Sequence, residues 1–193
     1  MLSVKDIDVY IQASHILRRL SLEVREREVV CLVGRNGAGK TTTLRSIMGY
    51  LRPRAGSIRF KGAPIQGALT HEIARRGIGF APEDSGIFPD LTVAENIEIA
   101  TWTRPGGRPA AERLDLAYGV FPVLRRYAAR KGPEMSGGER KMLSIARALA
   151  LDPDMLLLDE PFEGLSPAII PAVSEGIAQI TRHGHAILKA ASN

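Results

Sequence analysis

The chain of 193 residues has a single cysteine, few aromatic side chains and no long apolar run. No stretch approaches the roughly 20 apolar residues that cross a bilayer, and no charged-then-apolar leader opens the sequence. We therefore expect neither a membrane pore nor an exported protein. The lone cysteine, Cys31, excludes an internal disulfide, and it is predicted to be a small core residue in a reducing compartment.

The charge and composition are those of an ordinary globular protein. Apolar residues make up 45% of the chain and charged residues 24%, with a net charge of +5. A chain of this length can bury one substantial core with a small insertion. The basic residues are spread along the chain without interleaved aromatics, which favours a solvated surface that accepts an anionic nucleotide. Nucleic acid and anionic lipid headgroups are the alternatives.

The segment over residues 29–48 contains the most specific motif. The apolar run Val29–Val33 predicts a buried strand. Residues 34–41, Gly-Arg-Asn-Gly-Ala-Gly-Lys-Thr, then fit the phosphate-binding pattern G-x-x-x-x-G-K-[ST], and a helix is predicted over 42–48. The glycines let successive backbone N–H groups point at an anion, and the helix adds its positive end. Lys40 can reach the β- and γ-phosphates, and the Thr41 hydroxyl can hold Mg²⁺.

This loop supplies the predicted nucleotide-binding residues. They are Gly34, Arg35, Asn36, Gly37, Ala38, Gly39, Lys40, Thr41 and Thr42.

Patterns elsewhere predict strands alternating with helices. Strands are expected over residues 2–11, 16–24, 57–60, 78–81 and 155–160, and helices over 91–100 and 110–124. Because only helical patterns occur between residues 84 and 134, we predict a nucleotide-binding core over 1–83 and 135–193 with an inserted helical subdomain over 84–134.

Two carboxylates, Asp159 and Glu160, follow the apolar run over residues 155–158. Such a run is typical of a strand buried on both faces of a parallel sheet, and ligands of α/β folds bind at the carboxyl ends of these strands. Asp159 is placed to hold Mg²⁺ and Glu160 to polarise the water that attacks the γ-phosphate. Solvated acids at a strand end are the alternative, and the phosphate loop in the same chain favours the catalytic interpretation.

A second glycine-bearing helix start follows residue 135. Ser136 is a natural N-cap, and Gly137 and Gly138 leave N–H groups open to an anion. From these residues alone, a plain capped helix and an anion site are both open.

Assembled in this order, the segments resemble the ATPase subunits of ABC transporters from Leu2 to about Leu188. Met135-Ser136-Gly137-Gly138-Glu139 is similar to the family signature, with methionine in place of the usual leucine, and residues 164–167 look like the loop that communicates across a dimer. The resemblance implies an α/β P-loop NTPase core with a mostly parallel sheet, an N-terminal antiparallel β portion and an inserted helical subdomain. It also implies a head-to-tail dimer, with each ATP bound between residues 34–42 of one chain and Ser136, Gly137 and Gly138 of the other.

A finer likeness points to one branch of this family. Residues 82–83 and 88–96 are similar to the ATPases of branched-chain amino acid importers, in which a glutamate such as Glu83 occurs where most members have a glutamine that senses Mg²⁺. The resemblance implies Lys40, Glu83 and Glu160 as catalytic residues and Thr41, Glu83 and Asp159 as metal ligands.

The same likeness implies the cofactors, partners and location. ATP and Mg²⁺ are the expected cofactors. The expected partners are a second ATPase subunit, transmembrane permease subunits and, indirectly, a solute-binding protein, with no nucleic acid. The chain would be cytoplasmic and peripheral at the inner face of the cell membrane.

Two positions depart from the family pattern. The adenine-stacking aromatic would fall at Ile11, and the neighbouring Tyr10 would face the opposite side of a strand. Ser192 falls at the switch position, normally histidine or, in this branch, glutamine, and the family's remaining carboxyl-terminal elements are absent. A truncated or diverged terminus leaves a second hypothesis, a non-catalytic or weakly active nucleotide-binding module. A soluble ABC ATPase acting on nucleic acid is a third.

Overall fold

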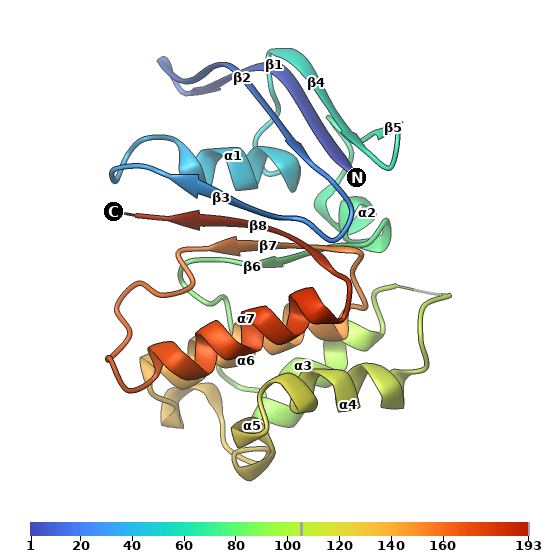
Figure 1. The fold of residues 1–193 in the computed structure, drawn as a ribbon, viewed down its shortest axis with the longest axis vertical. Coiled ribbons are helices and arrows are strands. Elements are labelled where there is room, and N and C mark those ends of the chain that lie inside the picture. The colour runs from blue at the N-terminus through green and yellow to red at the C-terminus, as the bar shows by residue number, and fades with distance from the viewer. Residues whose placement is uncertain (105, 193) are drawn as a thin grey trace.

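An antiparallel sheet forms one layer of the computed structural model, which describes residues 1–104 and 106–192 (Figure 1). Its strand order is β2-β1-β4-β5, and every neighbouring pair is antiparallel. The strands are β1 (Leu2–Ile11), β2 (Ser14–Val24), β4 (Ala55–Phe60) and β5 (Ala63–Pro64).

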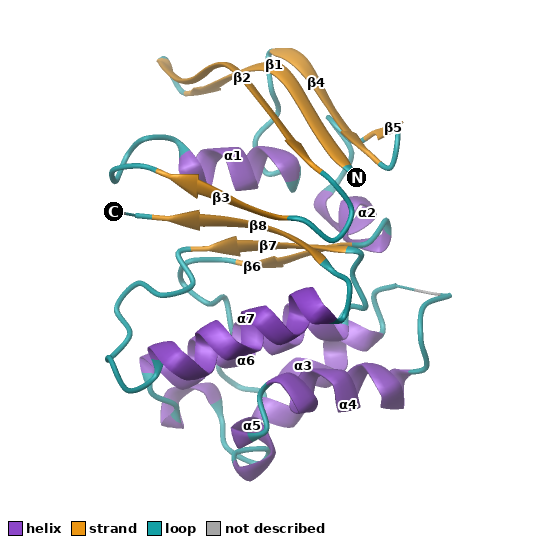
Figure 2. Ribbon diagram, in the orientation of Figure 1, coloured by secondary structure: helices purple, strands orange, loops and turns teal. Residues whose placement is uncertain are grey.

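A parallel sheet forms the centre of the molecule (Figure 2). Its order is β3-β8-β7-β6, and each of its three pairings is parallel. The strands are β3 (Val29–Val33), β6 (Ile78–Ala81), β7 (Met155–Asp159) and β8 (Ala186–Ala191). These two sheets and their helices confirm the predicted α/β class with an N-terminal antiparallel portion.

Helices cover both faces of the parallel sheet. Figure 1 shows α1 (Lys40–Ile47) between the two sheets, whereas α6 (Gly137–Ala150) and α7 (Ile170–Arg182) lie against the opposite face. The remaining helices are α2 (Thr70–Arg75), α3 (Val93–Thr101), α4 (Ala110–Val120) and α5 (Val123–Arg126), with a 3₁₀ turn over Gly132–Glu134.

Alternation along the central strands divides the core in two. On β7, Leu156 and Leu158 pack with the helices α3 to α7, whereas Met155 and Leu157 pack with α1 and the antiparallel sheet. This follows from the two-residue period of a strand, which sends successive side chains to opposite faces. All of β7 is therefore buried, as its apolar run predicts.

Strand β3 is not the buried strand that its composition predicts. It lies at the edge of the parallel sheet, and Val29 and Val33 are 41% and 60% exposed. Only alternate residues, Val30 and Leu32, pack against the core. The prediction that Cys31 is a core residue is wrong for the same reason, because its position in the alternation faces outward and it is exposed.

The stretch over residues 84–134 contains α3, α4 and α5, and its helices share one apolar cluster with α6 and α7. Its status as a separate subdomain stays a prediction. Among the described residues, no helix has both the length and the apolarity needed to cross a membrane.

Candidate functional site

The loop between β3 and α1 depends on glycine for its shape. Gly37 and Gly39 have positive φ angles of 82° and 93°, a region that side chains disfavour. A Cβ at Gly39 would also lie 2.6 Å from the Cδ2 atom of Leu17. The turn brings the chain directly into α1, so that backbone N–H groups and the start of the helix face one small space.

Lys40 makes its contacts within this loop and with the end of β7. Its Nζ atom donates hydrogen bonds to the carbonyl oxygens of Gly34 (2.8 Å) and Arg35 (3.2 Å). It also lies 3.2 Å from Oε1 of Glu160, and the two side chains are only 8% and 9% exposed. The predicted phosphate-binding lysine and the predicted catalytic glutamate are therefore brought together as a buried ion pair.

Ser192 completes this cluster. Its hydroxyl oxygen lies 2.5 Å from Oε1 of Glu160 and 2.7 Å from Oδ1 of Asn36, and it accepts a hydrogen bond from Lys40 Nζ at 3.1 Å. Its backbone N–H donates to Oε2 of Glu160 at 2.9 Å. Burial acts to raise the pKa of Glu160, but the hydrogen bonds from Ser192 and Lys40 outweigh it and hold the pKa below its usual value.

Thr41 and Asp159 meet beside this cluster. The Thr41 hydroxyl donates to Oδ1 of Asp159 at 3.1 Å. Burial raises the pKa of Asp159, and the nearby charges of Glu83 and Glu160 raise it further. Binding of a cation beside Asp159 would therefore stabilise its ionised carboxylate.

The donor set fits Mg²⁺ that enters with a phosphate. Hydroxyl and carboxylate oxygens are the hard ligands that Mg²⁺ prefers, and protein magnesium sites often supply only one or two carboxylates, with substrate phosphates completing the shell. Within the described residues no group of three or more acidic, histidine or cysteine side chains could hold a metal by itself. The predicted third ligand, Glu83, has an exposed side chain, and its backbone carbonyl accepts a hydrogen bond from Lys141.

The second glycine-bearing helix start is the capped end of α6. The Ser136 hydroxyl accepts from the N–H of Glu139 at 3.3 Å, and the Glu139 carboxylate accepts from the Ser136 N–H at 2.8 Å. A Cβ at Gly138 would lie 2.8 Å from Ile169, whereas Gly137 faces open space. The predicted cap is confirmed. Figure 1 shows α6 and α1 on opposite faces of the parallel sheet, so this helix start and the phosphate loop lie in different layers of the chain.

Neither Tyr10 nor Ile11 presents a free aromatic ring on which adenine could stack. The Tyr10 ring is stacked on His15 at 4.1 Å, and the Arg54 guanidinium lies 4.2 Å from its centroid. Both interactions hold the ring within the antiparallel sheet. Ile11 is exposed at the end of β1.

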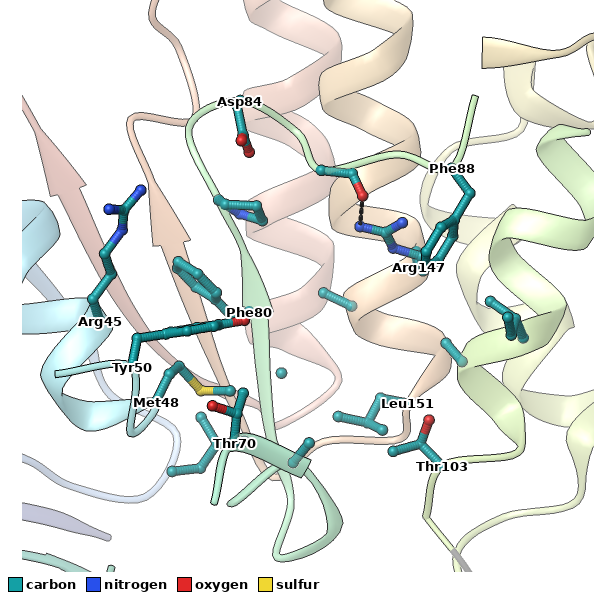
Figure 3. Close-up of a pocket in the computed structure, with 18 of the residues that line it drawn as sticks. Arg45, Met48, Tyr50, Thr70, Phe80, Asp84, Phe88, Thr103, Arg147 and Leu151 are labelled. Carbon is teal, nitrogen blue, oxygen red and sulfur yellow. Dashed lines mark hydrogen bonds between the residues drawn. The ribbon is translucent and has the colours of Figure 1, made fainter. Parts of the chain in front are cut away.

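A groove of about 810 Å³ lies on the side of the molecule reached by the loop after β6 (Figure 3). Arg147 of α6 borders it, donating to the carbonyl oxygen of Gly86 at 2.8 Å and covering the Phe88 ring at 5.1 Å. Tyr50 and Phe80 lie on the other side of the groove with their rings 6.2 Å apart. Tyr50 and Phe88 are large exposed aromatics, which is typical of a surface that meets a partner.

Lys141 is a residue that the sequence patterns did not single out. It lies in the buried stripe of α6, between Gly138 and Ile145, yet it carries a charge. The sequence signal that could have identified it is a lysine at an apolar position of a predicted helix, because a lysine is rarely buried without a partner.

Together, a glycine-bearing loop at a strand end, its lysine, a hydroxyl–carboxylate pair and a buried glutamate define a P-loop nucleotide-binding site. The chain belongs to the ABC transporter ATPases, because the family model for ABC transporters matches residues 17–163. ATPases of this family hydrolyse ATP and work as dimers together with transmembrane permease subunits.

Individual relatives differ in the transport systems that their names describe. The chain is 40% identical over 185 residues to the high-affinity branched-chain amino acid transport ATP-binding protein BraG of Pseudomonas aeruginosa, covering 95% of this chain and 78% of the relative. It is 37% identical over 175 residues to the lipopolysaccharide export ATP-binding protein LptB of Acidithiobacillus ferridurans, covering 90% and 72%.

Solved structures show the same fold. The dimeric post-hydrolysis cassette MJ0796, bound to ADP and Pi, superposes with a TM-score of 0.83 at 25% identity, covering 99% of this chain and 88% of that chain.

Proposed function

We propose that this chain hydrolyses ATP and thereby powers an importer of branched-chain amino acids or related amides. The observation that carries the enzymatic part is the convergence of Lys40, Thr41, Asp159 and Glu160 on the single loop between β3 and α1. These residues come from distant parts of the sequence, and each supplies a group that phosphoryl transfer to water requires.

The roles follow from the positions. Lys40 would leave Glu160 and bind the phosphates, while the ionised Glu160 carboxylate would accept a proton from the attacking water. Thr41 and Asp159 would hold Mg²⁺, with Glu83 nearby, and the ion would neutralise charge on the phosphates.

A second copy of the ATPase would complete the site. The helix start at Ser136, Gly137 and Gly138 lies on the other face of the parallel sheet from α1 of its own chain (Figure 1), and it would face the γ-phosphate held by residues 34–42 of the partner. The similarity to a dimeric cassette that holds ADP and Pi supports this arrangement. ATP would then favour the closed dimer, and hydrolysis would remove that preference.

The groove beside Arg147 is the proposed docking place for the permease. Its loop, which includes Ser85 and Gly86, directly follows Glu83, so a permease segment in the groove would contact the chain adjoining the nucleotide site. This arrangement would place the chain at the inner face of the membrane. Replacing Arg147 by methionine should weaken association with the permease in a pull-down from detergent, with unchanged association as the contrary result.

The proposed solute class draws on the similarity to BraG. Expression in Pseudomonas aeruginosa cells that lack BraG should restore leucine uptake, with the Glu160→Gln variant as the inactive control. If the purified chain releases phosphate in a Mg²⁺-dependent manner but fails to restore uptake, the importer assignment is refuted while the ATPase assignment stands.

A second candidate is a nucleotide-binding module without efficient hydrolysis. It is favoured by Ser192, which holds Glu160 where the family pattern has histidine or glutamine. Steady-state phosphate release with and without Mg²⁺ separates the two candidates, because robust Mg²⁺-dependent release would dismiss the second.

A further inference from the structure

A second cavity, of about 530 Å³, lies at the edge of the parallel sheet opposite the phosphate loop. Residues that precede β3, β7 and β8 line it, together with Lys61 and part of the connection between α3 and α4. Because β3, β7 and β8 run parallel, their amino ends meet at one edge, whereas the phosphate loop follows the carboxyl end of β3. The cavity is therefore separate from the candidate nucleotide site, and no part of the proposed function uses it.

Positive charge exceeds negative charge in the lining of this cavity. The lysine and arginine side chains are Arg27, Lys61, Arg104 and Arg108, and the acids are Glu26, Asp152 and Asp154. Asp154 serves two cations, since its Oδ2 atom lies 2.8 Å from Lys61 Nζ and 2.7 Å from Arg104 Nη2. Asp152 pairs with Arg108 at 2.7 Å. In residues 1–104 and 106–192, neither Glu26 nor Arg27 forms an ion pair. The lining therefore keeps a net positive charge that an anion would neutralise.

Arg27 lies beside the turn that leads into His185. The N–H of Ile187 donates to the carbonyl oxygen of Glu28 at 2.9 Å, so the starts of β3 and β8 are adjacent. A Cβ at Gly184 would lie 3.6 Å from Nε of Arg27. The unpaired guanidinium and the imidazole therefore belong to neighbouring walls of the same cavity.

His185 contributes a ring nitrogen without a partner. The residue is 6% exposed, and its Nδ1 atom lies 2.7 Å from the carbonyl oxygen of Pro153. A carbonyl oxygen only accepts, so Nδ1 carries the hydrogen and Nε2 of the neutral ring has a lone pair. Nε2 is buried and has no hydrogen-bond partner among the described residues. Protonation would turn Nε2 into a donor, from which an anion in the cavity would accept a hydrogen bond.

We propose that this cavity binds the phosphate group of a small molecule, with Arg27, Lys61 and protonated His185 as its donors. Guanidinium and ammonium groups form charge-assisted hydrogen bonds with phosphate oxygens. The phosphate would draw Lys61 away from Asp154, which Arg104 would continue to neutralise. The volume lies within the range of small-molecule sites and exceeds what an inorganic ion fills, so space remains for an organic part.

Anion binding would be coupled to protonation of His185. Burial lowers the pKa of His185, and Arg108 and His183 lower it further, whereas the Pro153 carbonyl and the charge of Asp152 act in the opposite direction. The ring is therefore neutral near neutral pH when no anion is bound. A bound dianion would raise this pKa, so a proton would be taken up and the affinity for the anion would rise as the pH falls.

The test follows the His185 ring of the full chain by long-range ¹H–¹⁵N NMR during titration with sodium sulfate, whose charge stays constant near neutral pH. Sulfate should move the Nε2 signal toward that of a protonated ring, and it should bind more tightly at about pH 6 than at about pH 8. Arg27→Gln should weaken this binding at least about tenfold. Arg25→Gln, which changes an exposed arginine of the same turn outside the cavity, should match the wild type.

Two further arms separate this cavity from other phosphate sites. Sulfate would also enter the phosphate loop, but the response of His185 should persist in Lys40→Gln. A failure of the proposed ATPase function would therefore leave this comparison unchanged. Glycerol 3-phosphate should bind more tightly than inorganic phosphate, because only the ester fills the remaining space.

Four results would overturn the inference. They are a His185 signal that sulfate does not move, an equal sulfate affinity in Arg27→Gln, loss of the response in Lys40→Gln, and glycerol 3-phosphate that binds no more tightly than inorganic phosphate. Lys61→Gln provides a second variant if Arg27→Gln does not fold, as judged by circular dichroism, and it should weaken sulfate binding as well.

Discussion

Replacement of Glu160 by glutamine should separate nucleotide binding from hydrolysis. Glutamine keeps the shape and an oxygen that can accept the hydrogen bond from Ser192, but it cannot accept a proton from water or form an ion pair with Lys40. Lys40 Nζ lies 3.2 Å from Oε1 of Glu160, so the phosphates of ATP would compete with this carboxylate for the lysine. The variant removes that competition.

The buried ion pair sets the expected size of the effect on binding. A hydrogen bond to a charged group contributes about 1.5–3 kcal/mol, and since both side chains are nearly fully buried, solvent screens the pair little. With about 1.4 kcal/mol per factor of ten, the Glu160→Gln variant should bind ATP roughly tenfold to a hundredfold more tightly. Loss of a general base lowers turnover by about 10²–10⁴-fold.

The assay measures the two effects separately. Equilibrium dialysis with ATP in the absence of Mg²⁺ reports binding without turnover, and phosphate release with Mg²⁺ reports hydrolysis. Size-exclusion chromatography with Mg²⁺ and ATP should show the variant as a dimer. Glu98→Gln, an exposed acid on α3, is the control for loss of one negative charge. Unchanged turnover would refute the catalytic role of Glu160, and unchanged ATP affinity would refute the competition for Lys40.

Three further changes test other parts of the structure. Burial and the charges of Glu83 and Glu160 raise the Asp159 pKa, so ionising this acid costs more in the folded state than in the unfolded state. Asp159→Asn should therefore stabilise the protein without nucleotide by on the order of 1 kcal/mol in urea unfolding at pH 7. This gain should disappear as the pH falls through the Asp159 pKa of the folded state. Ser136→Asp keeps a good N-cap, so the thermal midpoint should hold, while a carboxylate facing the partner's γ-phosphate should weaken the ATP-dependent dimer at least about tenfold by analytical ultracentrifugation. Cys31 is exposed, so a thiol reagent should label it in the folded protein; a thiol that reacts only in denaturant would contradict the position of β3.

The strands and capped helices were predictable because each depends on nearby residues. Ile78–Ala81 and Met155–Asp159 are strands as their apolar runs predict, and Thr92 and Ser136 cap helices through the glutamate three residues later. Strand β3 has a similar apolar run and is not buried. Its exposure depends on which strand lies beside it, and the pattern of one segment does not contain that information.

The phosphate loop was predictable for the same local reason, whereas the state of its side chains was not. The motif identifies Lys40 and Thr41, but it does not reveal that Lys40 is bound to Glu160 or that Thr41 donates to Asp159. These contacts join residues more than a hundred positions apart. Ser192 illustrates the same limit. The family pattern has histidine or glutamine at its position, so the sequence predicts a missing functional group there. In the folded chain, however, both the hydroxyl and the N–H of Ser192 form hydrogen bonds with Glu160.

The internal charge pairs predict how ATP and Mg²⁺ should depend on one another. ATP alone would have to break the pair between Lys40 and Glu160 and would leave that acid without its cation, while Mg²⁺ alone would meet Asp159 and Thr41 without the phosphate oxygens that complete its shell. When both enter, the phosphates would bind Lys40 and the metal would offset the charge of Asp159 and Glu160, so each ligand would reduce the electrostatic cost of binding the other. We therefore expect positive coupling between ATP and the metal in binding, reciprocal by linkage.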